Sequence, residues 1–453
     1  HRTRGREGVT GHHRLEKGKT GETLSSQTVS TQLQQLAEQA AAHPEWKFTT
    51  LAQRMDEEWL RVAYTQVRKG GAPGIDEVTA AEYERNLEEN LRQLHERLKR
   101  GDYSAPPVRR VWLEKASGGQ RPIGIPTFED KIVQRAVTLL LNAIYEQDFY
   151  DFSYGFRPRR SAHDALQALR ERCMQGDIHW IIDADISGCF DNIQHKALQE
   201  IVKERVNDGR ILQLIGKWLH AGVMEGGQIH YPEAGTPQGG VISPVLANIY
   251  LHTVLDQWFV EEVQPRLRGA AFLIRYADDF IIGCQREDDA RRIMEALPKR
   301  CARYGLSIQP SKSRLLRFRP PQKGHKTHNQ SFDFLGFTHY WGRSQRGKWI
   351  MLRKTSGKRL RRTLQGFGQW CREHRHLPLP EQARRLAQKL RGYYQYQAVR
   401  GNYRTLKKVY YEVCRMWLYW LRRCGGKRRL TWERYQQILQ RFPLPRPRIL
   451  HYI

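Results

Sequence analysis

The amino-acid sequence predicts an α+β protein in which an antiparallel sheet is backed by helices and followed by a helical C-terminal region. Two β-prone apolar runs flank the residues Tyr276–Asp279, and this is the pattern of a β-hairpin. Segments with helical periodicity, such as 129–145, precede and follow these runs. The region 351–453 combines helical patterns with a large excess of basic residues. At 453 residues the chain is long enough for two or three domains.

The composition indicates a protein that binds a polyanion. The chain has a formal net charge of +29 and a pI near 10.0, and it contains 12 Trp, 20 Tyr and 15 Phe. Nucleic acid is the expected partner ahead of a membrane, because no amphipathic anchor and no long apolar run is present. The 7 cysteines are odd in number and lack CxxC spacing, which favours reduced thiols in a cytosolic protein. The polar, basic first residues show no secretory signal.

The N-terminal segment 1–45 is predicted to be a mobile basic extension. Residues 1–30 are rich in Gly, Ser, Thr, Lys and Arg and have no apolar period. Such a segment is either a nucleic-acid-binding arm or a solvated tail. Helical spacing begins at Leu33, and a second helical pattern covers 51–67.

Three aspartates are the candidate catalytic and metal-binding residues. Asp278 and Asp279 lie in the tight turn of the hairpin, and Asp185 lies at the end of the apolar strand 180–186. A charge at the end of a buried strand is costly unless it is paired or binds metal. Carboxylates suit Mg²⁺, so the three aspartates would hold two Mg²⁺ ions, for which Mn²⁺ could substitute. The alternative for an isolated Asp-Asp pair is an ordinary hairpin turn.

In such a site one ion would activate an attacking 3′-hydroxyl and the other would neutralise a leaving pyrophosphate. Two further aspartates, Asp183 and Asp191, lie in or just after the same strand as Asp185. For these two the alternative is a cap or an ion pair with a local Arg.

Three motifs, in this order and spacing, resemble the reverse transcriptases of the group II intron type: Asp185–Asp191, Thr236–Gly240 and the hairpin around Asp278. The resemblance extends from about residue 30 to the end. It implies an RNA-directed DNA polymerase of right-hand architecture, with fingers and an antiparallel-sheet palm over 46–345. An α-helical thumb, also called the maturase region, would cover 346–453. The implied partners are an RNA template, a DNA primer, deoxynucleoside triphosphates and the protein's own group II intron RNA, bound during splicing and retrohoming.

The resemblance also assigns roles in the fingers. The segment Gly70–Asp76 resembles an extra N-terminal motif that forms a lid over template RNA, although a helix-to-helix turn fits it equally well. Lys115 and Arg121 lie on either side of a predicted hairpin turn, where they would hold the incoming triphosphate. In the family's second fingers motif, Arg157 would contact a template phosphate; the alternative is an ion pair with Asp151.

Three palm residues are assigned to nucleotide binding by resemblance. Phe190 would collide with a 2′-hydroxyl and so select deoxynucleotides, unless it is a core residue. Gln238 lies in a glycine turn whose small residues allow close approach to a base pair or sugar. Lys312, in the segment Gly305–Ser313, would approach the nucleotide phosphates. The segment Phe332–Phe337 matches the one that closes the palm and grips the primer strand.

The C-terminal region is the most basic part of the chain. Residues 351–453 contain 26 Lys and Arg against 4 Glu, a net +22 of the total +29. One helix face is expected to be bundle core, with Leu406, Val409, Tyr410, Val413, Trp417, Trp420 and Leu421. The candidate nucleic-acid-binding residues on the other faces and in the preceding segment are Arg391, Arg404, Lys407 and Lys408. No Cys and His pattern of an endonuclease domain follows, which fits the bacterial lineages that lack this domain and borrow a primer.

Two alternatives remain open from the sequence. One is a splicing-only maturase that binds RNA without polymerising, although such a protein would be expected to lose the catalytic carboxylates that this chain retains. The other is a reverse transcriptase domesticated for host defence or repair. In each case we expect a cytoplasmic protein without membrane association, which would join the bacterial nucleoid when it acts on DNA.

Overall fold

A computed structural model describes residues 17–114, 119–175, 177–231, 235, 239–321, 330–423 and 430–453, with only the backbone considered for 17–26. The chain forms two compact units. Unit 1 comprises His1–Val111, Pro122–Asp148 and Gln199–Val245, and unit 2 comprises Trp112–Arg121, Phe149–Leu198 and Leu246–Ile453. These limits do not follow the predicted domain boundaries at 45 and 345, which stay predictions.

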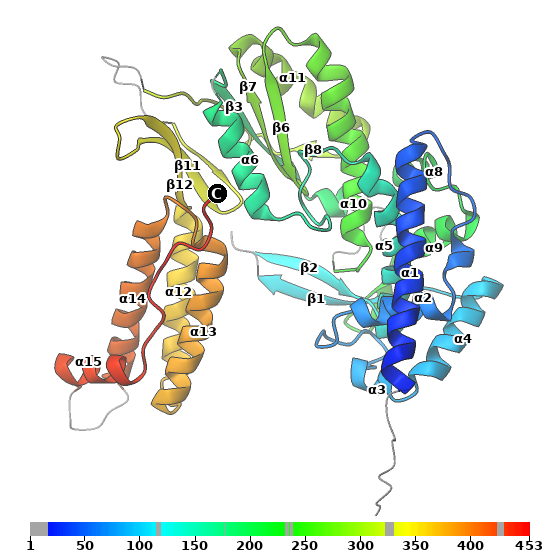
Figure 1. The fold of residues 1–453 in the computed structure, drawn as a ribbon, viewed down its shortest axis with the longest axis horizontal. Helices are drawn as coiled ribbons and strands as arrows, with labels where there is room; N and C mark the ends of the chain where they lie inside the picture. Colours follow the sequence, from blue (N-terminus) through cyan, green and yellow to red (C-terminus); the bar gives the residue numbers. More distant parts are fainter. Residues whose placement is uncertain are drawn as a thin grey trace, which may run out of the picture. The chain divides into compact units, whose positions relative to one another are not determined.

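Unit 1 is mainly helical (Figure 1). Its helices, with the two that run on into unit 2, are α1 (Lys17–Ala42), η1 (Ala52–Arg54), α2 (Glu57–Gln66), α3 (Ala80–Glu84), α4 (Leu87–Arg100), α5 (Phe128–Asp148), α8 (His195–Lys203), α9 (Gly209–Leu219) and α10 (Ser243–Leu251). Polar side chains fix several starts: Asp56 accepts from the backbone N–H of Trp59, and Thr79 and Glu82 form a capping box.

Helix α1 occupies the second part of the segment 1–45, for which a mobile extension stays a prediction. It packs along α5, and Val29, Leu36 and Ala40 are almost fully buried. The helical spacing that the sequence showed from Leu33 onward corresponds to an apolar stripe, which becomes part of the core of unit 1. Its second half is therefore an integral helix of the fold.

A small sheet of order β2-β1-β4-β5 accompanies these helices. Its strands are β1 (Val108–Glu114), β2 (Gln120–Ile125), β4 (Val223–Glu225) and β5 (Gln228–His230). β1 runs parallel to β4, with Val108 opposite Val223. The tip of the β1–β2 hairpin is counted with unit 2.

Unit 2 contains the main antiparallel sheet, of order β6-β7-β3-β8 with β9 also paired to β3. The strands are β3 (Trp180–Ser187), β6 (Ala271–Tyr276), β7 (Asp279–Cys284), β8 (Ser307–Ile308) and β9 (Arg314–Arg317). Every pairing is antiparallel, as predicted for the palm. Helices α6 (Ala162–Met174) and α11 (Glu287–Arg303) pack against the sheet.

One face of this sheet changes character along its length. Ile181 and Ile281 pack with Leu166 of α6 in an apolar cluster. Because side chains two residues apart share a face of a strand, the same face carries Asp183 and Asp185 further along. The apolar half of this face packs against α6, and the acidic half carries the partly buried aspartates.

Several short elements connect the sheet to its surroundings. These are α7 (Cys189–Asn192), η2 (His252–Val263), which continues α10 as a π-helix, and η3 (Gln264–Arg266). A second antiparallel sheet, β10 (Phe332–Phe334), β11 (Phe337–Arg343) and β12 (Trp349–Thr355), shares the apolar cluster with α6.

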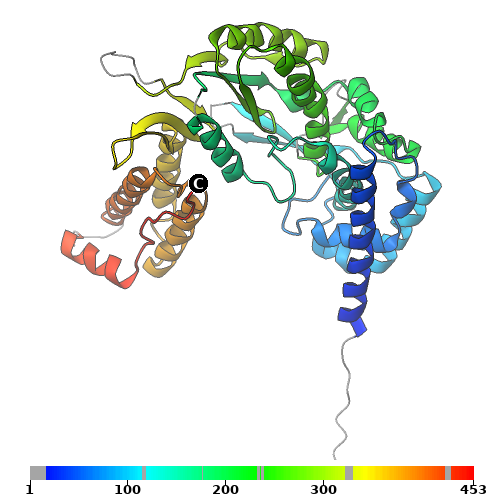
Figure 2. The same ribbon diagram turned by 45° about the horizontal axis from the view of Figure 1, so that its top comes forward.

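The C-terminal region is a helical bundle, as predicted. It consists of α12 (Gly357–Glu373), α13 (Leu379–Gln397), α14 (Tyr403–Leu421) and α15 (Trp432–Arg441). Figures 1 and 2 show the first three side by side. The predicted core face of α14 is confirmed, since Leu406, Val409, Val413 and Trp417 are fully buried and the remaining three residues are partly buried.

Two further features concern the described residues only. The six cysteines among them are free thiols and are buried, in agreement with the expectation from their spacing. None of the helices in the described part of the chain is long and apolar enough to cross a membrane.

Candidate active site

The candidate site is built on the hairpin of β6 and β7. Tyr276 pairs with Asp279, so Ala277 and Asp278 form a two-residue turn. Ala277 has a φ of 56°, and a positive φ at the first turn position only is the pattern of a type II′ turn. Glycine is the usual residue at this position, and an alanine there costs on the order of 1–2 kcal/mol. The turn therefore needs support from its surroundings.

Strand β3 brings the third aspartate to the hairpin. Asp185 lies directly opposite Asp279 in the antiparallel pairing. Like charges at opposite positions on neighbouring strands destabilise a sheet. The sheet register thus brings together residues that the sequence places 94 positions apart. Nearby positive charge would reduce the repulsion between them.

The electrostatics of the aspartates reflect this crowding. Partial removal of water, and then repulsion from Asp278, Asp183 and Asp185, raise the pKa of Asp279 to about 7. The residue stays open to solvent on one side. Burial and the charge of Asp185 also raise the pKa of Asp278. Clustered acids with raised pKa values are typical of functional sites.

Three cations of the chain partly offset these charges. The Lys312 Nζ lies 2.8 Å from Asp185 Oδ2, and Arg314 Nε lies 3.1 Å from Asp183 Oδ2. Arg121, from the tip of the β1–β2 hairpin, lowers the pKa of Asp278. Asp183 is thus a paired acid, one of the two alternatives that its sequence position had left open.

The position of Lys312 follows from the loop between β8 and β9. The backbone N–H of Gln309 donates to the Asp185 carbonyl at 2.9 Å, and that of Lys312 donates to the Gln309 carbonyl at 3.1 Å. This loop turns back beside β3 and places the ammonium group on the Asp185 carboxylate.

The donor set fits a hard divalent cation in its chemistry, although its side chains are not gathered around one. Three mutually repelling carboxylates, with Asp183 beside them, are the oxygen ligands that such ions prefer. Among the described residues, no three acidic, His or Cys side chains converge closely enough to hold an ion. Asp185 is engaged by Lys312 instead, so loading of a metal requires that this ion pair opens.

A buried ion pair supports the hairpin from behind. Arg275 Nε and Nη2 donate to the two carboxylate oxygens of Asp256 at 2.7 and 2.6 Å, and both side chains are fully buried. Burial alone would raise the pKa of Asp256, but Arg275 and the nearby His252 hold it below its ordinary value. Asp256 comes from the π-helix η2, a type of segment that is frequent near functional sites.

The same guanidinium reaches the turn itself. Arg275 Nη1 donates to the Ala277 carbonyl at 3.1 Å and to Asn248 Oδ1 at 3.0 Å. Asn248 Nδ2 in turn donates to the Gly155 carbonyl at 2.7 Å. These bonds fix the carbonyl that follows the strained φ of Ala277, and they supply the support that the turn needs.

Arg275, Asp256 and Asn248 were not among the site residues predicted from the sequence. An arginine in an apolar strand was a signal, because a buried cation must find an acid. The sequence could not indicate which of the chain's 47 acidic residues that would be.

The segment around Gly155 has a structural role against the turn. The backbone N–H of Tyr154 donates to the Arg275 carbonyl at 2.9 Å, so this segment adds to the edge of β6. A Cβ at Gly155 would lie 2.3 Å from the Ala277 nitrogen. Only glycine allows this approach without displacing the hairpin.

Arg157 lies in the loop before α6. Its side chain is buried, and Nη1 donates to the carbonyls of Tyr150 and Ser153, both at 2.7 Å. Asp151, the alternative partner, is paired with Arg160. The guanidinium holds its own loop together, and its expected contact with a template phosphate stays a prediction.

The turn between β10 and β11 also reaches the site. The backbone N–H of Leu335 bonds to the Asp279 carboxylate, and the Leu335 carbonyl accepts from the Tyr396 hydroxyl of α13 at 2.8 Å. The segment expected to grip a primer strand thus links the helical bundle to Asp279, one of the three candidate catalytic aspartates.

The other predicted site residues fall into three groups. Phe190 is half-buried on α7, directly after β3, and so is not the fully buried core residue of the alternative. Arg391, Arg404, Lys407 and Lys408 are all exposed on the helical bundle. Lys115 and Gln238 lie outside the described residues.

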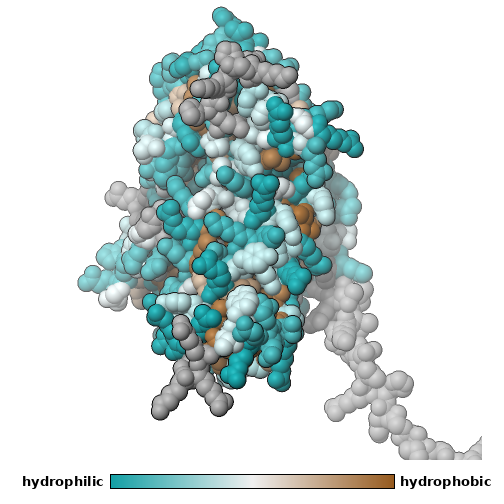
Figure 3. Space-filling view, turned by 90° about the vertical axis from the view of Figure 1, so that its left-hand side faces the viewer, coloured by the Kyte–Doolittle hydropathy of each residue, from teal (hydrophilic) through white to brown (hydrophobic). Residues whose placement is uncertain are grey.

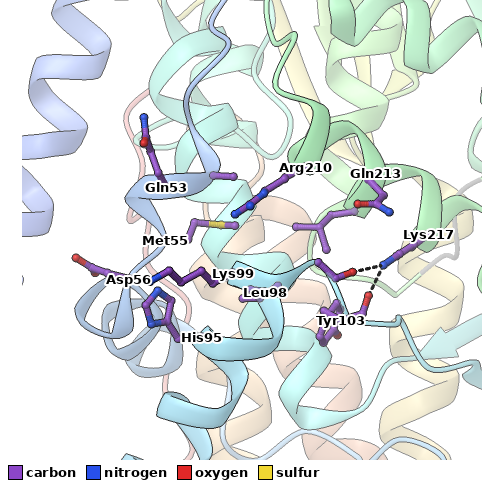
Figure 4. Close-up of a pocket in the computed structure, with 13 residues that line it drawn as sticks. Gln53, Met55, Asp56, His95, Leu98, Lys99, Tyr103, Arg210, Gln213 and Lys217 are labelled. Atoms are coloured by element: carbon purple, nitrogen blue, oxygen red, sulfur yellow. Dashed lines mark hydrogen bonds between the residues drawn. The ribbon is translucent and has the colours of Figure 1, made fainter.

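A separate pocket of about 370 Å³ lies in unit 1 (Figure 4). Its apolar lining includes Met55, Leu98 and Leu214, and its polar lining includes Arg210 and Lys217. Figure 4 shows Lys217 donating to two backbone oxygens, those of Gly101 and Tyr103. Lys217 therefore links α9 to the loop after α4 through these two hydrogen bonds.

Comparisons with known proteins agree with this geometry. Residues 113–339 match the family described as "Reverse transcriptase (RNA-dependent DNA polymerase)". Over 224 residues the chain is 39% identical to the group II intron-encoded protein LtrA of Lactococcus lactis subsp. cremoris, covering 47% of this chain and 37% of that protein. Over 286 residues it is 35% identical to the protein YkfC of Escherichia coli (strain K12), covering 56% of this chain and 75% of YkfC.

A fungal relative is similar over a shorter segment. The uncharacterized 91 kDa protein in the cob intron of Schizosaccharomyces pombe is 43% identical over 167 residues, which are 37% of this chain and 20% of that protein. The chain thus spans well under half the length of LtrA and of this fungal protein. The family match extends from the end of β1 through the aspartate hairpin to β11, and with these relatives it shows that the chain belongs to the reverse transcriptase family, of the type encoded by group II introns.

Proposed function

We propose that this protein is an RNA-directed DNA polymerase that extends a DNA primer on an RNA template with deoxynucleoside triphosphates. The observation that carries the proposal is the sheet register that sets Asp185 opposite Asp279, next to the Asp278 turn. Three clustered acids are suited to binding metal ions, and the bound ions would in turn hold phosphate groups. Reverse transcriptases generally use divalent metal ions.

In this proposal Asp185, Asp278 and Asp279 hold two Mg²⁺ ions, for which Mn²⁺ could substitute. Bound there, the ions would stabilise charge on the attacking 3′-oxygen and on the leaving pyrophosphate. Asp185 becomes available when Lys312 releases it, and the freed ammonium group is then within reach of the nucleotide phosphates. Lys312 would thereby couple nucleotide binding to the loading of metal.

The remaining site residues would position the nucleotide. Lys115 and Arg121 neutralise the triphosphate, as cations do where charge develops in the transition state. Phe190 excludes a 2′-hydroxyl and so selects deoxynucleotides, and Gln238 approaches the sugar or base pair. The half-buried position of Phe190 beside the exposed Asp191 and the effect of Arg121 on the pKa of Asp278 support these roles.

A second activity accompanies the first in our proposal: binding of the protein's own group II intron RNA to assist splicing and retrohoming. The printed name of LtrA describes it as encoded by such an intron. The net +22 of residues 351–453 and the exposure of Arg391, Arg404, Lys407 and Lys408 support a polyanionic partner. The free thiols fit the cytoplasm, where the protein would join the nucleoid when copying into DNA.

The test is extension of a labelled DNA primer on an RNA template with Mg²⁺, using the wild type, Asp278→Ala and a matched control, Asp288→Ala. Asp288 is a surface acid of the same unit that pairs with Arg286. We expect extension by the wild type and the control and none by Asp278→Ala, while all three melt at similar temperatures. No extension by the wild type with either Mg²⁺ or Mn²⁺, or extension by Asp278→Ala, would overturn the proposal.

A further inference from the structure

Helix α14 presents an exposed row in which aromatic rings alternate with cations. Its members follow one another at every fourth position, and all of them are exposed: Tyr403, Lys407, Tyr411, Arg415, Tyr419 and Arg423. Residues four apart lie on one slanting row of a helix surface. Lys407 was predicted from the sequence to bind nucleic acid, and Tyr411 and Tyr419 were not. We call this set the α14 row.

The three tyrosines contribute little to the core of the bundle. They are 48%, 54% and 49% exposed in chain order, whereas Leu406, Val409, Val413 and Trp417 of the same helix are fully buried. Lys407 lies 5.8 Å from the Tyr411 ring centroid, and Arg423 lies 4.4 Å from that of Tyr419. Tyr411 and Tyr419 thus each have a cation over one face of the ring, which leaves the other face for a flat ligand group.

The spacing along the row suits a strand rather than a compact ligand. Successive tyrosines are eight residues apart, which is about 12 Å along an α-helix, and a cation lies about 6 Å from each. The rings are too far apart to stack on one another, so each can receive a separate flat group.

The row ends in a hollow of about 860 Å³ between α14 and α15. Arg415, Tyr419, Arg422 and Trp432 line it, and Trp432 is 50% exposed. Figure 3 views the molecule from the side on which α14 and α15 lie in Figure 1, and there hydrophilic side chains predominate, with pale and apolar ones scattered among them. The hollow adds a fourth aromatic platform to the three on the row.

The charge around the row indicates a polyanion. Arg404, Lys408 and Arg422 are also exposed on α14. Glu412, the acid of this helix, is engaged by Arg415 at 3.1 Å. Protein interfaces are depleted in lysine, whereas a basic face with interleaved rings is the arrangement that holds nucleic acids.

We propose that the α14 row binds an unpaired stretch of nucleic acid, with bases stacked on Tyr403, Tyr411 and Tyr419 and phosphates on the cations between them. A duplex hides the faces of its bases and would leave the rings without partners. The inference deepens the proposed function by naming the form of its RNA partner, and it rests on that function only for RNA as the expected strand. Single-stranded DNA offers the same chemistry.

The test measures fluorescence anisotropy of the full chain with three labelled probes: an unstructured uridine oligomer, its DNA counterpart and an RNA duplex. The variants are Tyr411→Ala with Tyr419→Ala, the same pair changed to Phe, and the matched control Tyr452→Ala, a residue that is 78% exposed outside the row. Each lost ring should weaken binding of the unpaired probe about tenfold. The Phe pair and the control should bind as the wild type does, and binding of the duplex should hardly change.

Salt dependence separates the rings from the cations. Lys407→Ala with Arg415→Ala should lower the dependence of affinity on salt, because a protein that makes fewer phosphate contacts releases fewer counterions when it binds. The alanine pair of tyrosines should keep the wild-type dependence. Stronger binding of uridine oligomer than of DNA, or the reverse, identifies the preferred strand, and either result upholds an unpaired ligand.

Two outcomes would overturn the inference: equal loss of duplex and single-strand binding in the tyrosine variant, or no loss of either. Binding is measured without metal or nucleotide, so it does not depend on polymerisation. A chain that binds the unpaired probe through its tyrosines but extends no primer would sink the polymerase proposal and leave this one standing.

Discussion

The aspartate hairpin and the α14 row belong to the same unit but use charge in opposite ways. Around the hairpin, charges are enclosed and interlocked: Arg275 is fully buried and bonds to Asp256, Asn248 and the Ala277 carbonyl. Along the row, Lys407 and its neighbours stand in solvent with few protein contacts. The first arrangement fixes atoms in place for chemistry, and the second offers a surface that adapts to a long ligand.

The difference teaches how each region should respond to change. Removing one partner of a buried ion pair leaves the other charge without water or a partner, which greatly lowers the free energy of unfolding. It also displaces the residues that the pair holds in place. An exposed cation is hydrated before and after its neighbours are changed, so removing one leaves no buried charge without a partner. The loss of affinity is therefore small, and the losses from separate cations add up.

The largest effect should come from Arg275→Met. Asp256 would be left buried without its cation, and we expect a loss of about 3–5 kcal/mol in the free energy of unfolding, measured by urea denaturation. Arg275→Met combined with Asp256→Leu should recover much of this stability, since apolar replacements of buried pairs are often tolerated. Primer extension should remain impaired in the double variant, because the Ala277 carbonyl has lost its donor. If stability and extension both returned, the pair would be a packing feature only.

A smaller effect is expected for Asn248→Ala. Asn248 joins the guanidinium to the Gly155 carbonyl and acts as a positioning residue behind the turn. We expect extension to fall about 10–100-fold, as for residues that orient metal ligands, with a higher Mg²⁺ concentration needed for the half-maximal rate. Asn90→Ala, which removes an amide bonded to the Tyr83 carbonyl in unit 1, is the control. An unchanged Mg²⁺ dependence would mean that Asn248 only stabilises the fold.

The buried His339 should make the stability of the protein depend on pH. A buried imidazole without an acidic partner should stay neutral in the folded protein. Burial, and then the charge of Arg353, lower the pKa of His339 to about 3, whereas the unfolded imidazole titrates near 6.5. The unfolded state therefore binds more protons between these values, and stability falls with decreasing pH. From pH 7.5 to 5.5 the wild type should lose about 1.4 kcal/mol relative to His339→Phe, measured by denaturation of both proteins at each pH. A pH-independent difference would contradict the assignment.

The smallest effect should come from Lys407→Ala on the row. The slope of log affinity against log salt for an unpaired RNA probe should decrease by about 0.7, and affinity should fall only a few-fold. Lys203→Ala, a surface lysine of unit 1 paired with Glu200, should leave the slope unchanged. A loss as severe as that of Arg275→Met would end the distinction between the two regions.

Much of this architecture could be predicted because it is encoded locally. Alternation of apolar residues indicated β3, β6 and β7, and helical spacing indicated the buried face of α14. The aspartates stood out because charge is unusual beside such strands. The antiparallel sheet and the helical region followed from these patterns.

The rest depends on which surfaces meet. Arg157 is buried because its own loop folds around it, which no spacing predicts. The exposure of Tyr411 and Tyr419 depends on which side of α14 the other helices of the bundle cover. Aromatic residues on a basic helix suggested core, and the distinction between core and open surface required the tertiary structure.

The docking of α1 has a practical consequence for truncation. Arg205 donates to the carbonyls of Ala40, His43 and Trp46 as well as to Asp148 of α5, at 2.7–3.1 Å. Cleavage after residue 45 would remove the first two of these acceptors and uncover the apolar surface under Leu36. A shortened chain that retains its fold should therefore be cut before α1 rather than after it.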